Sequence, residues 1–169
     1  VADEVGLTVS GRGTPAEETG DAGGKILLLE RGAFTDVHAA MMVHPAPIDV
    51  VDPSIIACST FHVHYTGKEA HASAFPERGI NAADAFTVAQ TAIGLQRQHI
   101  RSTDRIHGII TNGGDAPNII PAHTVATYIV RAKTLDDLDE IKEKVQRCFE
   151  AGALATGSKL KIVGGHKPY

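Results

Sequence analysis

The sequence predicts a mixed α/β protein in two parts, a partial catalytic-type α/β domain over residues 1–52 and an α+β domain over residues 53–169. Three observations support this prediction. The first part contains two apolar runs separated by a helical segment, and prolines interrupt the pattern between Pro45 and Pro53. In the second part, runs with alternating apolar residues are interleaved with segments of helical periodicity.

The first part is predicted to form a βαβ unit. Val5–Ser10 and His38–Val43 are the predicted strands, Gly11–Gly24 is a loop, and Lys25–Arg31 is a helix ended by Gly32. A strand, a helix and a second strand in this order imply a parallel pair with a right-handed crossover. Two strands and one helix are too little sheet to bury a core, so this part needs further strands.

The second part is predicted to form a ferredoxin-like domain. Its elements are a strand at Ile56–Thr66, a helix at Asn81–His99, strands at Arg105–Thr111 and Ala122–Ala132, a helix opened by Thr134, and a strand at Ser158–Val163. This order is βαββαβ, which is typical of four antiparallel strands with two helices on one face.

The second helix of this domain carries clear end signals. Thr134 is the expected N-cap and Gly157 the expected residue after the C-cap. Between them, apolar residues recur at helical spacing and are expected to face the core: Leu138, Ile141, Val145, Cys148 or Phe149, and Gly152.

Composition narrows the function classes. The 169 residues are 43% hydrophobic and 21% charged, as is ordinary for a globular protein. The net charge of −4 and the lack of a basic stripe argue against nucleic acid or an anionic membrane as a partner. The distant pair Cys58 and Cys148 favours reduced, buried thiols in a cytoplasmic protein. The start at Val1, without Met or a signal peptide, is expected to lie inside a longer protein.

Two adjacent carboxylates, Glu17 and Glu18, follow the first predicted strand, and His44 ends the second. If the strands are parallel, all three lie at the carboxyl edge of the sheet, where open α/β sheets carry their sites. One carboxylate can bind zinc while its neighbour faces a metal-bound water, whose pKa zinc lowers to about 7. The pattern therefore indicates a piece of a zinc-dependent amide-bond hydrolase.

Other interpretations of these three residues stay open. Thr14-x-x-Glu17 also matches a capping box, in which Glu18 is a solvated neighbour. His44 alone is equally typical of a hydrogen-bonded histidine at a strand end.

The second part contains further polar candidates. His71 follows the first strand without a partner at ligand spacing, so hydrogen bonding to a substrate or to developing oxyanion charge suits it better than metal binding. Asn118 and Arg131 are of the types that recognise a substrate carboxylate. A loop histidine, a turn asparagine and a surface arginine are the alternatives. His62 and His64 share one strand face, which we expect to be a solvent or interface face.

Five motifs stand in order along the chain: GTPAEE, MMVHP, GKEAHASAFPERGINAADA, NGGDAPNIIP and VRA. Together they resemble the di-zinc metallopeptidases of family M twenty, which include aminoacylase, carboxypeptidase G and bacterial aminobenzoyl-glutamate hydrolase. The segments HGIITNGGDAPNIIP and FEAGALATGSKLKIVGG are especially similar to the aminoacylase-like dipeptidase branch.

The resemblance implies a catalytic α/β domain interrupted by a lid, or dimerisation, domain of ferredoxin-like topology. It implies that Glu17 is the general base and that Glu18 and His44 are zinc ligands. The ligands alone do not separate zinc from cobalt or manganese.

The resemblance also assigns roles to the lid residues. His71 matches a histidine that reaches the partner subunit's active site and stabilises the tetrahedral intermediate, which implies a homodimer formed through the lid. Asn118 and Arg131 match positions that hold the substrate's carboxylate. The expected substrate is an N-acyl amino acid or a dipeptide whose scissile amide lies next to a free carboxylate.

Glu18 and His44 are fewer than the three protein ligands that a catalytic zinc site normally uses. The family's other ligand motifs correspond to positions before Val1 and after Tyr169. We therefore expect an inactive fragment of an amidohydrolase. The alternative is a non-catalytic ferredoxin-like module for dimerisation or small-molecule binding.

Overall fold

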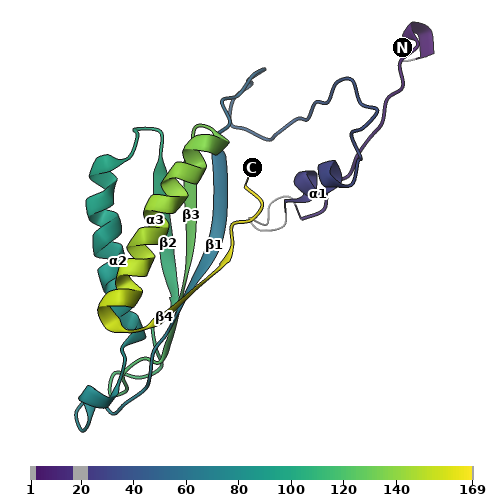
Figure 1. Cartoon of the computed structure of the whole chain (residues 1–169). Coiled ribbons are helices and arrows are strands. Elements are labelled where there is room, and N and C mark those ends of the chain that lie inside the picture. The colour runs from purple at the N-terminus through teal and green to yellow at the C-terminus, as the bar shows by residue number, and fades with distance from the viewer. Residues whose placement is uncertain (1–2, 17–22, 169) are drawn as a thin grey trace.

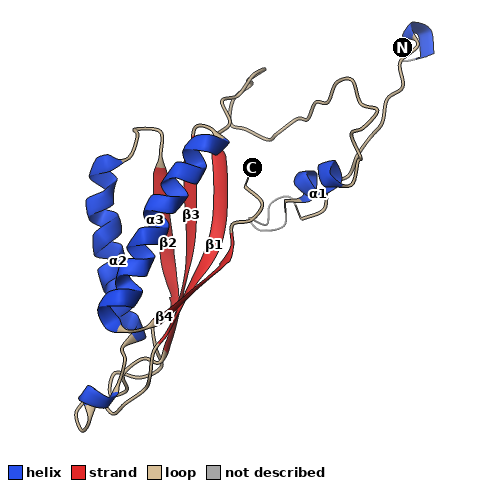
Figure 2. Ribbon diagram, in the orientation of Figure 1, coloured by secondary structure: helices blue, strands red, loops and turns tan. Residues whose placement is uncertain are grey.

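A computed structural model describes residues 3–16 and 23–168 of the chain. One sheet, covered on one face by two helices, dominates the fold (Figure 1). Its elements are β1 (Ala57–Thr66), α2 (Ala82–Gln96), β2 (Arg105–Asn112), β3 (His123–Ala132), α3 (Leu135–Thr156) and β4 (Lys159–Gly164). The strands are antiparallel in the order β2-β3-β1-β4, and the predicted βαββαβ domain is thereby confirmed (Figure 2).

The core lies between the sheet and the two helices. In β1, Phe61, Val63 and Tyr65 are buried, whereas the intervening His62 and His64 lie on the other face. The expected stripe of α3 is buried opposite them, and both Cys148 and Phe149 belong to it. Burial of each large apolar side chain stabilises the fold by about 1.5–3 kcal/mol.

Helix α3 begins and ends where its capping residues predict. The Thr134 hydroxyl accepts a hydrogen bond from the Asp137 amide at 3.1 Å. Gly157 adopts the left-handed conformation, with φ of 75°, and its amide donates to the Ala153 carbonyl. A residue without a Cβ reaches this conformation without strain, which explains the glycine at this position.

Gly152 allows α3 to approach its neighbours closely. A Cβ at this position would lie 2.3 Å from the Ala85 carbonyl oxygen of α2 and 2.9 Å from the Tyr65 hydroxyl. That hydroxyl donates to the Phe149 carbonyl at 2.7 Å, and burial raises the pKa of Tyr65. The small residue therefore sets the distance between the two helices.

The predicted strands of the first part are wrong for the residues that the structure describes. Between residues 3 and 56 it contains a short 3₁₀ helix, Asp3–Val5, and helix α1 (Gly24–Glu30), but neither Val5–Ser10 nor His38–Val43 forms a strand. The helix prediction at Lys25–Arg31 is confirmed to within one residue at each end. A strand requires a hydrogen-bonded neighbour, and no described segment pairs with either run.

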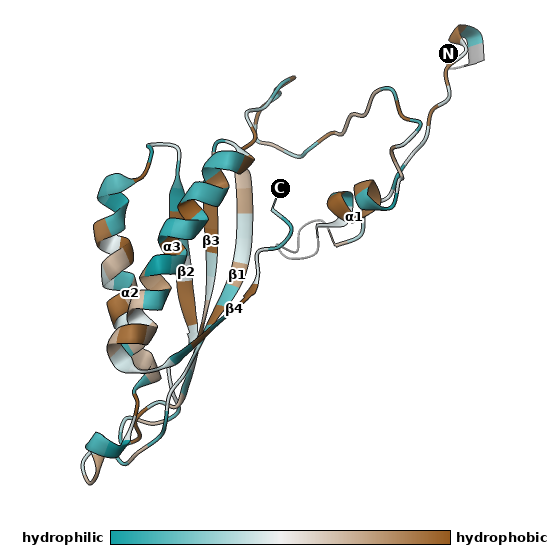
Figure 3. Cartoon of the chain, viewed as in Figure 1, coloured by the Kyte–Doolittle hydropathy of each residue, from teal (hydrophilic) through white to brown (hydrophobic). Residues whose placement is uncertain are grey.

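Many apolar side chains of this first part consequently stay exposed, although Ile26, Leu27 and Leu28 in α1 are half-buried. Figure 3 shows apolar residues in α1 and along the extended segment that leads to β1. Val9, Met41 and Val43 are 79%, 96% and 97% exposed. Among the described residues, no helix is long and apolar enough to cross a membrane.

Candidate functional site at the tip of the sheet

Two loops leave the same end of the sheet. The β1–α2 loop starts after Thr66, and the β2–β3 loop ends before His123, which is the register partner of Thr66. Because the antiparallel register places these residues side by side, both loops extend beyond one edge of the domain. We call this region, residues 67–80 and 113–122, the tip.

The two loops of the tip are joined by backbone hydrogen bonds. The Ala72 amide donates to the Asn118 carbonyl at 2.9 Å, and the Ile120 amide donates to the Ala70 carbonyl at 2.9 Å. His71 and Ile119 form an isolated antiparallel bridge between them. These contacts bring His71 and Asn118, which are far apart in sequence, to neighbouring positions on one structural unit.

The base of the β1–α2 loop depends on Gly67. The Gly67 amide donates to the Ala122 carbonyl at 2.7 Å, and Lys68 exchanges backbone hydrogen bonds with Ile80. A Cβ at Gly67 would lie 2.0 Å from the Ile80 carbonyl oxygen, so a larger residue would push the two sides of the loop apart. This glycine therefore helps to hold the tip in place.

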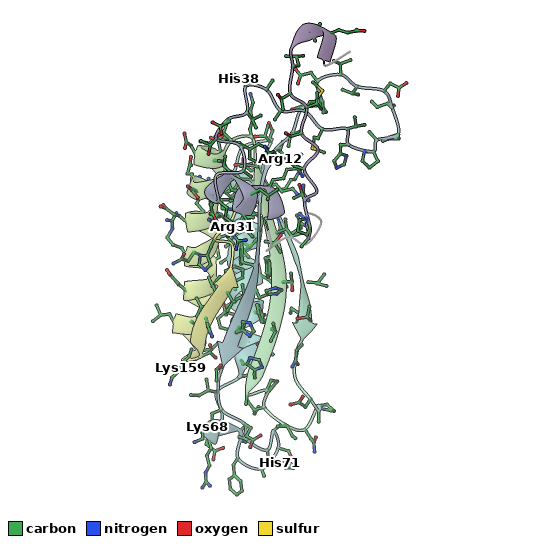
Figure 4. All side chains as sticks on the ribbon, turned by 90° about the vertical axis from the view of Figure 1, so that its right-hand side faces the viewer. Arg12, Arg31, His38, Lys68, His71 and Lys159 are labelled. Atoms are coloured by element: carbon green, nitrogen blue, oxygen red, sulfur yellow. The ribbon has the colours of Figure 1, made fainter. Side chains whose placement is uncertain are left out.

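The His71 side chain is exposed at the tip, at the opposite end of the molecule from Arg12, Arg31 and His38 (Figure 4). Its Nδ1 atom lies 3.3 Å from the backbone nitrogen of Ser73 and 3.2 Å from the Ser73 hydroxyl oxygen. An accessible imidazole on a braced loop can present a hydrogen-bond donor to a substrate that approaches from outside the chain.

Arg131 lies at the other end of the sheet. It pairs with Cys58 at the start of β1 and with Arg105 at the start of β2. Between His123 and Arg131, β3 extends by roughly 27 Å at about 3.4 Å per residue. Within one chain, the structure therefore brings His71 and Asn118 together but separates both from Arg131.

The histidines of β1 lie on the sheet face away from the helices, as the alternation predicts. His62 Nδ1 is 3.0 Å from the Thr127 hydroxyl, and His64 Nδ1 is 3.4 Å from His123 Nε2. Partial burial, followed by the charges of His123, His62 and Lys161, lowers the pKa of His64. His64 is thus less readily protonated than a free histidine would be.

The predicted metal half-site is not assembled by the described residues. Glu17 and Glu18 lie outside the described residues. His44 does not end a strand, contrary to the prediction: it is exposed in an extended segment, and its Nδ1 lies 2.8 Å from the Pro45 carbonyl oxygen. Over residues 3–16 and 23–168, no group of three or more histidine, cysteine, aspartate or glutamate side chains could hold a metal ion. These residues alone do not fit a zinc centre.

The described residues line two cavities of similar volume. One, of about 410 Å³, lies on the loop that carries Asn118 and is open to solvent; it is lined by Gly113, Gly114, Asp115, Ala116, Pro117, Ile119 and Pro121. The other, of about 400 Å³, lies between α3 and β4 and is remote from His71. Of the two, the first adjoins the candidate site.

The contact between Ser73 and His71 was missed by reasoning from the sequence. The spacing offered a signal, because a polar side chain in a turn can bond to the backbone amide two residues further along the chain. The pairing of the Ala72 amide with Asn118 had no comparable local signal, since it joins two separate loops.

The topology and the two joined loops define a ferredoxin-like α+β domain. The chain belongs to peptidase family M twenty: residues 58–156 match its peptidase dimerisation domain.

Curated relatives extend the match beyond this domain. The chain is 41% identical to the human Xaa-Arg dipeptidase over 157 residues, which cover 93% of this chain and 36% of that protein. It is 35% identical to a p-aminobenzoyl-glutamate hydrolase chain of Escherichia coli K12, over 92% of this chain and 32% of that protein. The chain thus spans about a third of the length of these hydrolases.

A solved structure supports the fold. The aminobenzoyl-glutamate utilization protein from Klebsiella pneumoniae superposes with a TM-score of 0.58 and 22% identity, over 66% of this chain and 28% of that one.

Proposed function

We propose that this chain is the lid domain, with part of the catalytic domain, of a metal-dependent amidohydrolase or dipeptidase. The substrate class is an N-acyl amino acid or a dipeptide with a free carboxylate beside the scissile amide. The observation that carries the proposal is the backbone pairing between the two loops of the tip, which holds His71 and Asn118 close together. The names of the relatives, a dipeptidase and an aminobenzoyl-glutamate hydrolase, support this substrate class.

The separation of Arg131 from the tip supports a site shared by two chains. Arg131 lies at the end of the sheet where β1 begins, and the segment that contains His44 leads directly into β1. The tip points away from that segment. One protomer would therefore supply Arg131, and its partner would supply His71 and Asn118.

The free edge of the sheet at β2 offers a way to build such a dimer. Along β2, Ile109 and Ile110 are 68% and 43% exposed, whereas the opposite edge strand, β4, carries Lys159 and Lys161. Lysines on an edge strand discourage pairing, and an apolar edge invites it. We therefore assign the homodimer contact to β2.

Antiparallel pairing of two β2 strands also has the required geometry. The Arg105 end of β2 lies beside Arg131, and the Asn112 end leads into the tip. An antiparallel two-fold contact places the Asn112 end of one protomer beside the Arg105 end of its partner. Each tip then extends toward the end of the partner that carries Arg131.

In this arrangement the residues of this chain have separate tasks. The His71 imidazole donates a hydrogen bond to the oxygen that becomes negatively charged when the amide carbonyl is attacked. The Asn118 amide and the Arg131 guanidinium hold the substrate's carboxylate. Glu17 takes the proton of the attacking water and passes it to the leaving amine. Glu18 and His44 would contribute metal ligands, and the proposed metal is zinc, with cobalt or manganese as alternatives.

Complementation in the complete gene product tests the shared site. His71→Ala and Arg131→Ala are each expected to abolish most amide hydrolysis. Mixing the two variants under conditions that exchange subunits should restore part of the activity, because one site of each mixed dimer has both side chains. No recovery, with exchange verified, would contradict the shared site.

A second experiment separates the enzyme from the non-catalytic alternative. We expect this chain alone, supplied with zinc, to show no amide hydrolysis, because it offers too few ligands for a catalytic metal. The complete gene product should hydrolyse N-acyl amino acids or dipeptides after metal loading. An inactive but dimeric complete protein would favour the dimerisation module instead.

Sedimentation equilibrium tests the assigned edge. The chain should dimerise, and Ile109→Lys combined with Ile110→Lys should shift it to monomer. Val163→Lys on β4 is the matched control and should leave the dimer unchanged. A monomeric wild-type chain, or dissociation by the β4 variant only, would contradict the assignment.

A further inference from the structure

The Ser73 backbone nitrogen determines the hydrogen-bonding state of the His71 ring. This nitrogen carries a proton and can only donate, and it lies 3.3 Å from His71 Nδ1. Nδ1 must therefore accept. In a neutral imidazole, one ring nitrogen accepts and the other carries the proton, so the proton of His71 resides on Nε2.

The Ser73 hydroxyl adds to this preference. Its oxygen lies 3.2 Å from the same Nδ1 atom. A hydroxyl rotates to suit its partner, and with Nδ1 already accepting from the backbone it donates as well. Two donors from one residue thus face one ring nitrogen of His71.

The backbone around Ser73 is fixed on both sides. The amides of Ala74 and Phe75 donate to the His71 carbonyl at 3.3 and 3.1 Å, which closes a turn. The Ala72 amide donates to Asn118 in the other loop. The position of Ser73 relative to the imidazole is therefore set by the tip and not by a free side chain.

We propose that Ser73 is a positioning residue that holds His71 in the Nε2–H tautomer and directs that N–H outward from the tip. The proposal rests on the proposed function in one respect: an Nε2–H donor is what a developing oxyanion on a partner-bound substrate requires. The opposite tautomer would present an unprotonated nitrogen there, which would repel the same charge.

The tautomer can be measured on this chain without any catalytic assay. Nitrogen-15 NMR of the histidine side chains distinguishes a protonated from an unprotonated ring nitrogen. The chain has nine histidines, and the spectrum of His71→Gln identifies the His71 signals by their loss. At neutral to alkaline pH, we expect an unprotonated Nδ1 and a protonated Nε2. A protonated Nδ1 in the wild-type chain would overturn the proposal.

Variants test the hydroxyl. Ser73→Ala keeps the backbone donor, which still favours the Nε2–H form, and removes the second donor, so the fraction of the Nδ1–H form should rise. Ser73→Thr keeps a hydroxyl at the same position and should restore the wild-type spectrum. Thr111→Val, which removes an exposed hydroxyl bonded to the Val125 carbonyl at the end of β2, is the matched control and should leave His71 unchanged. An unchanged tautomer in Ser73→Ala would show that the hydroxyl has no positioning role.

Activity of the complete gene product separates this proposal from the proposed function. If both hold, Ser73→Ala lowers kcat with little change in KM, and Ser73→Thr recovers it. If the NMR result holds and His71→Ala retains full activity, the oxyanion role fails while the tautomer assignment stands. If His71→Ala is inactive and Ser73→Ala is fully active, the positioning role fails and the proposed function stands.

Discussion

The two parts of the chain contain apolar residues of the same kinds but bury them very differently. In the ferredoxin-like domain, Val63 and Tyr65 are fully buried. In the first part, Val9 and Val43 are 79% and 97% exposed. Both parts show apolar runs in the sequence, so the difference comes from the availability of partners.

This comparison shows what an apolar run requires to become a strand. β1 has hydrogen-bonded neighbours on both sides, β3 and β4, and two helices cover its inner face. The run at His38–Val43 has no neighbouring strand among the described residues, and its residues are exposed to solvent instead. A strand pattern without a partner strand gains neither the hydrogen-bond ladder nor the burial.

Hydrogen exchange should give the largest contrast between the two parts. Amides in the middle of α3, such as Val145, are expected to exchange only through global unfolding, whereas Met41 and Val43 should exchange nearly as fast as an unfolded peptide. Helix α1, with seven residues and no side-chain cap, should also show little protection. Strong protection at residues 38–43 would contradict the comparison and restore the predicted strand.

Replacing one leucine in each part by alanine compares what the two parts contribute to the free energy of unfolding. Leu138→Ala removes a fully buried side chain of α3 and should reduce the free energy of unfolding by about 2–5 kcal/mol. Leu7→Ala changes a side chain that is 63% exposed, and its effect should stay within about 0.5 kcal/mol. Urea denaturation measures both, and equal effects would mean that Leu7 also belongs to a packed core.

Two helical glycines, Gly152 and Gly94, differ in the space around them, so alanine at each should have opposite effects on stability. Gly152→Ala places a methyl group against the Ala85 carbonyl and should cost about 1–3 kcal/mol of unfolding free energy. Gly94→Ala, in α2, meets no atom within 4 Å and should instead stabilise by about 0.5–1 kcal/mol. Thermal denaturation of the two variants should therefore move Tm in opposite directions; a stabilising Gly152→Ala would contradict the close helix contact.

The smallest expected effect concerns an exposed network of charged hydrogen bonds that joins Glu140 and Lys144 of α3 to Arg101. Hydrogen bonds from Lys144 and then Arg101, at 2.7 and 2.6 Å, lower the pKa of Glu140 to about 2. A carboxylate with a lowered folded-state pKa stabilises the fold above its unfolded-state pKa, and this contribution is lost as the pH falls toward 2.

Glu140→Gln should accordingly destabilise the chain slightly at pH 7, and the difference from wild type should vanish near pH 2. Added salt should shrink the difference at pH 7, because the network is exposed. Glu143→Gln is the control for a charge change on the same helix. A difference that grows on acidification would contradict the assigned sign.

Local signals in the sequence predicted most of the ferredoxin-like domain. Alternation located β1 and β3, and the Thr134 cap and the Gly157 stop located α3. The same kind of signal misled at Val5–Ser10 and His38–Val43, because periodicity reports which face of a segment is apolar and not whether another strand exists to pair with it. The placement of His44 at a strand end failed for this reason.

The sequence by itself determined the order of elements, the ends of α3, the buried stripe and the family resemblance, since each depends on residues that are close along the chain or on ordered motifs. Only the tertiary structure decided that His71 and Asn118 share one tip, that Ser73 faces the His71 ring, and that Arg131 lies at the far end of β3. These facts depend on strand register and on backbone pairing between separate loops, which no local pattern encodes.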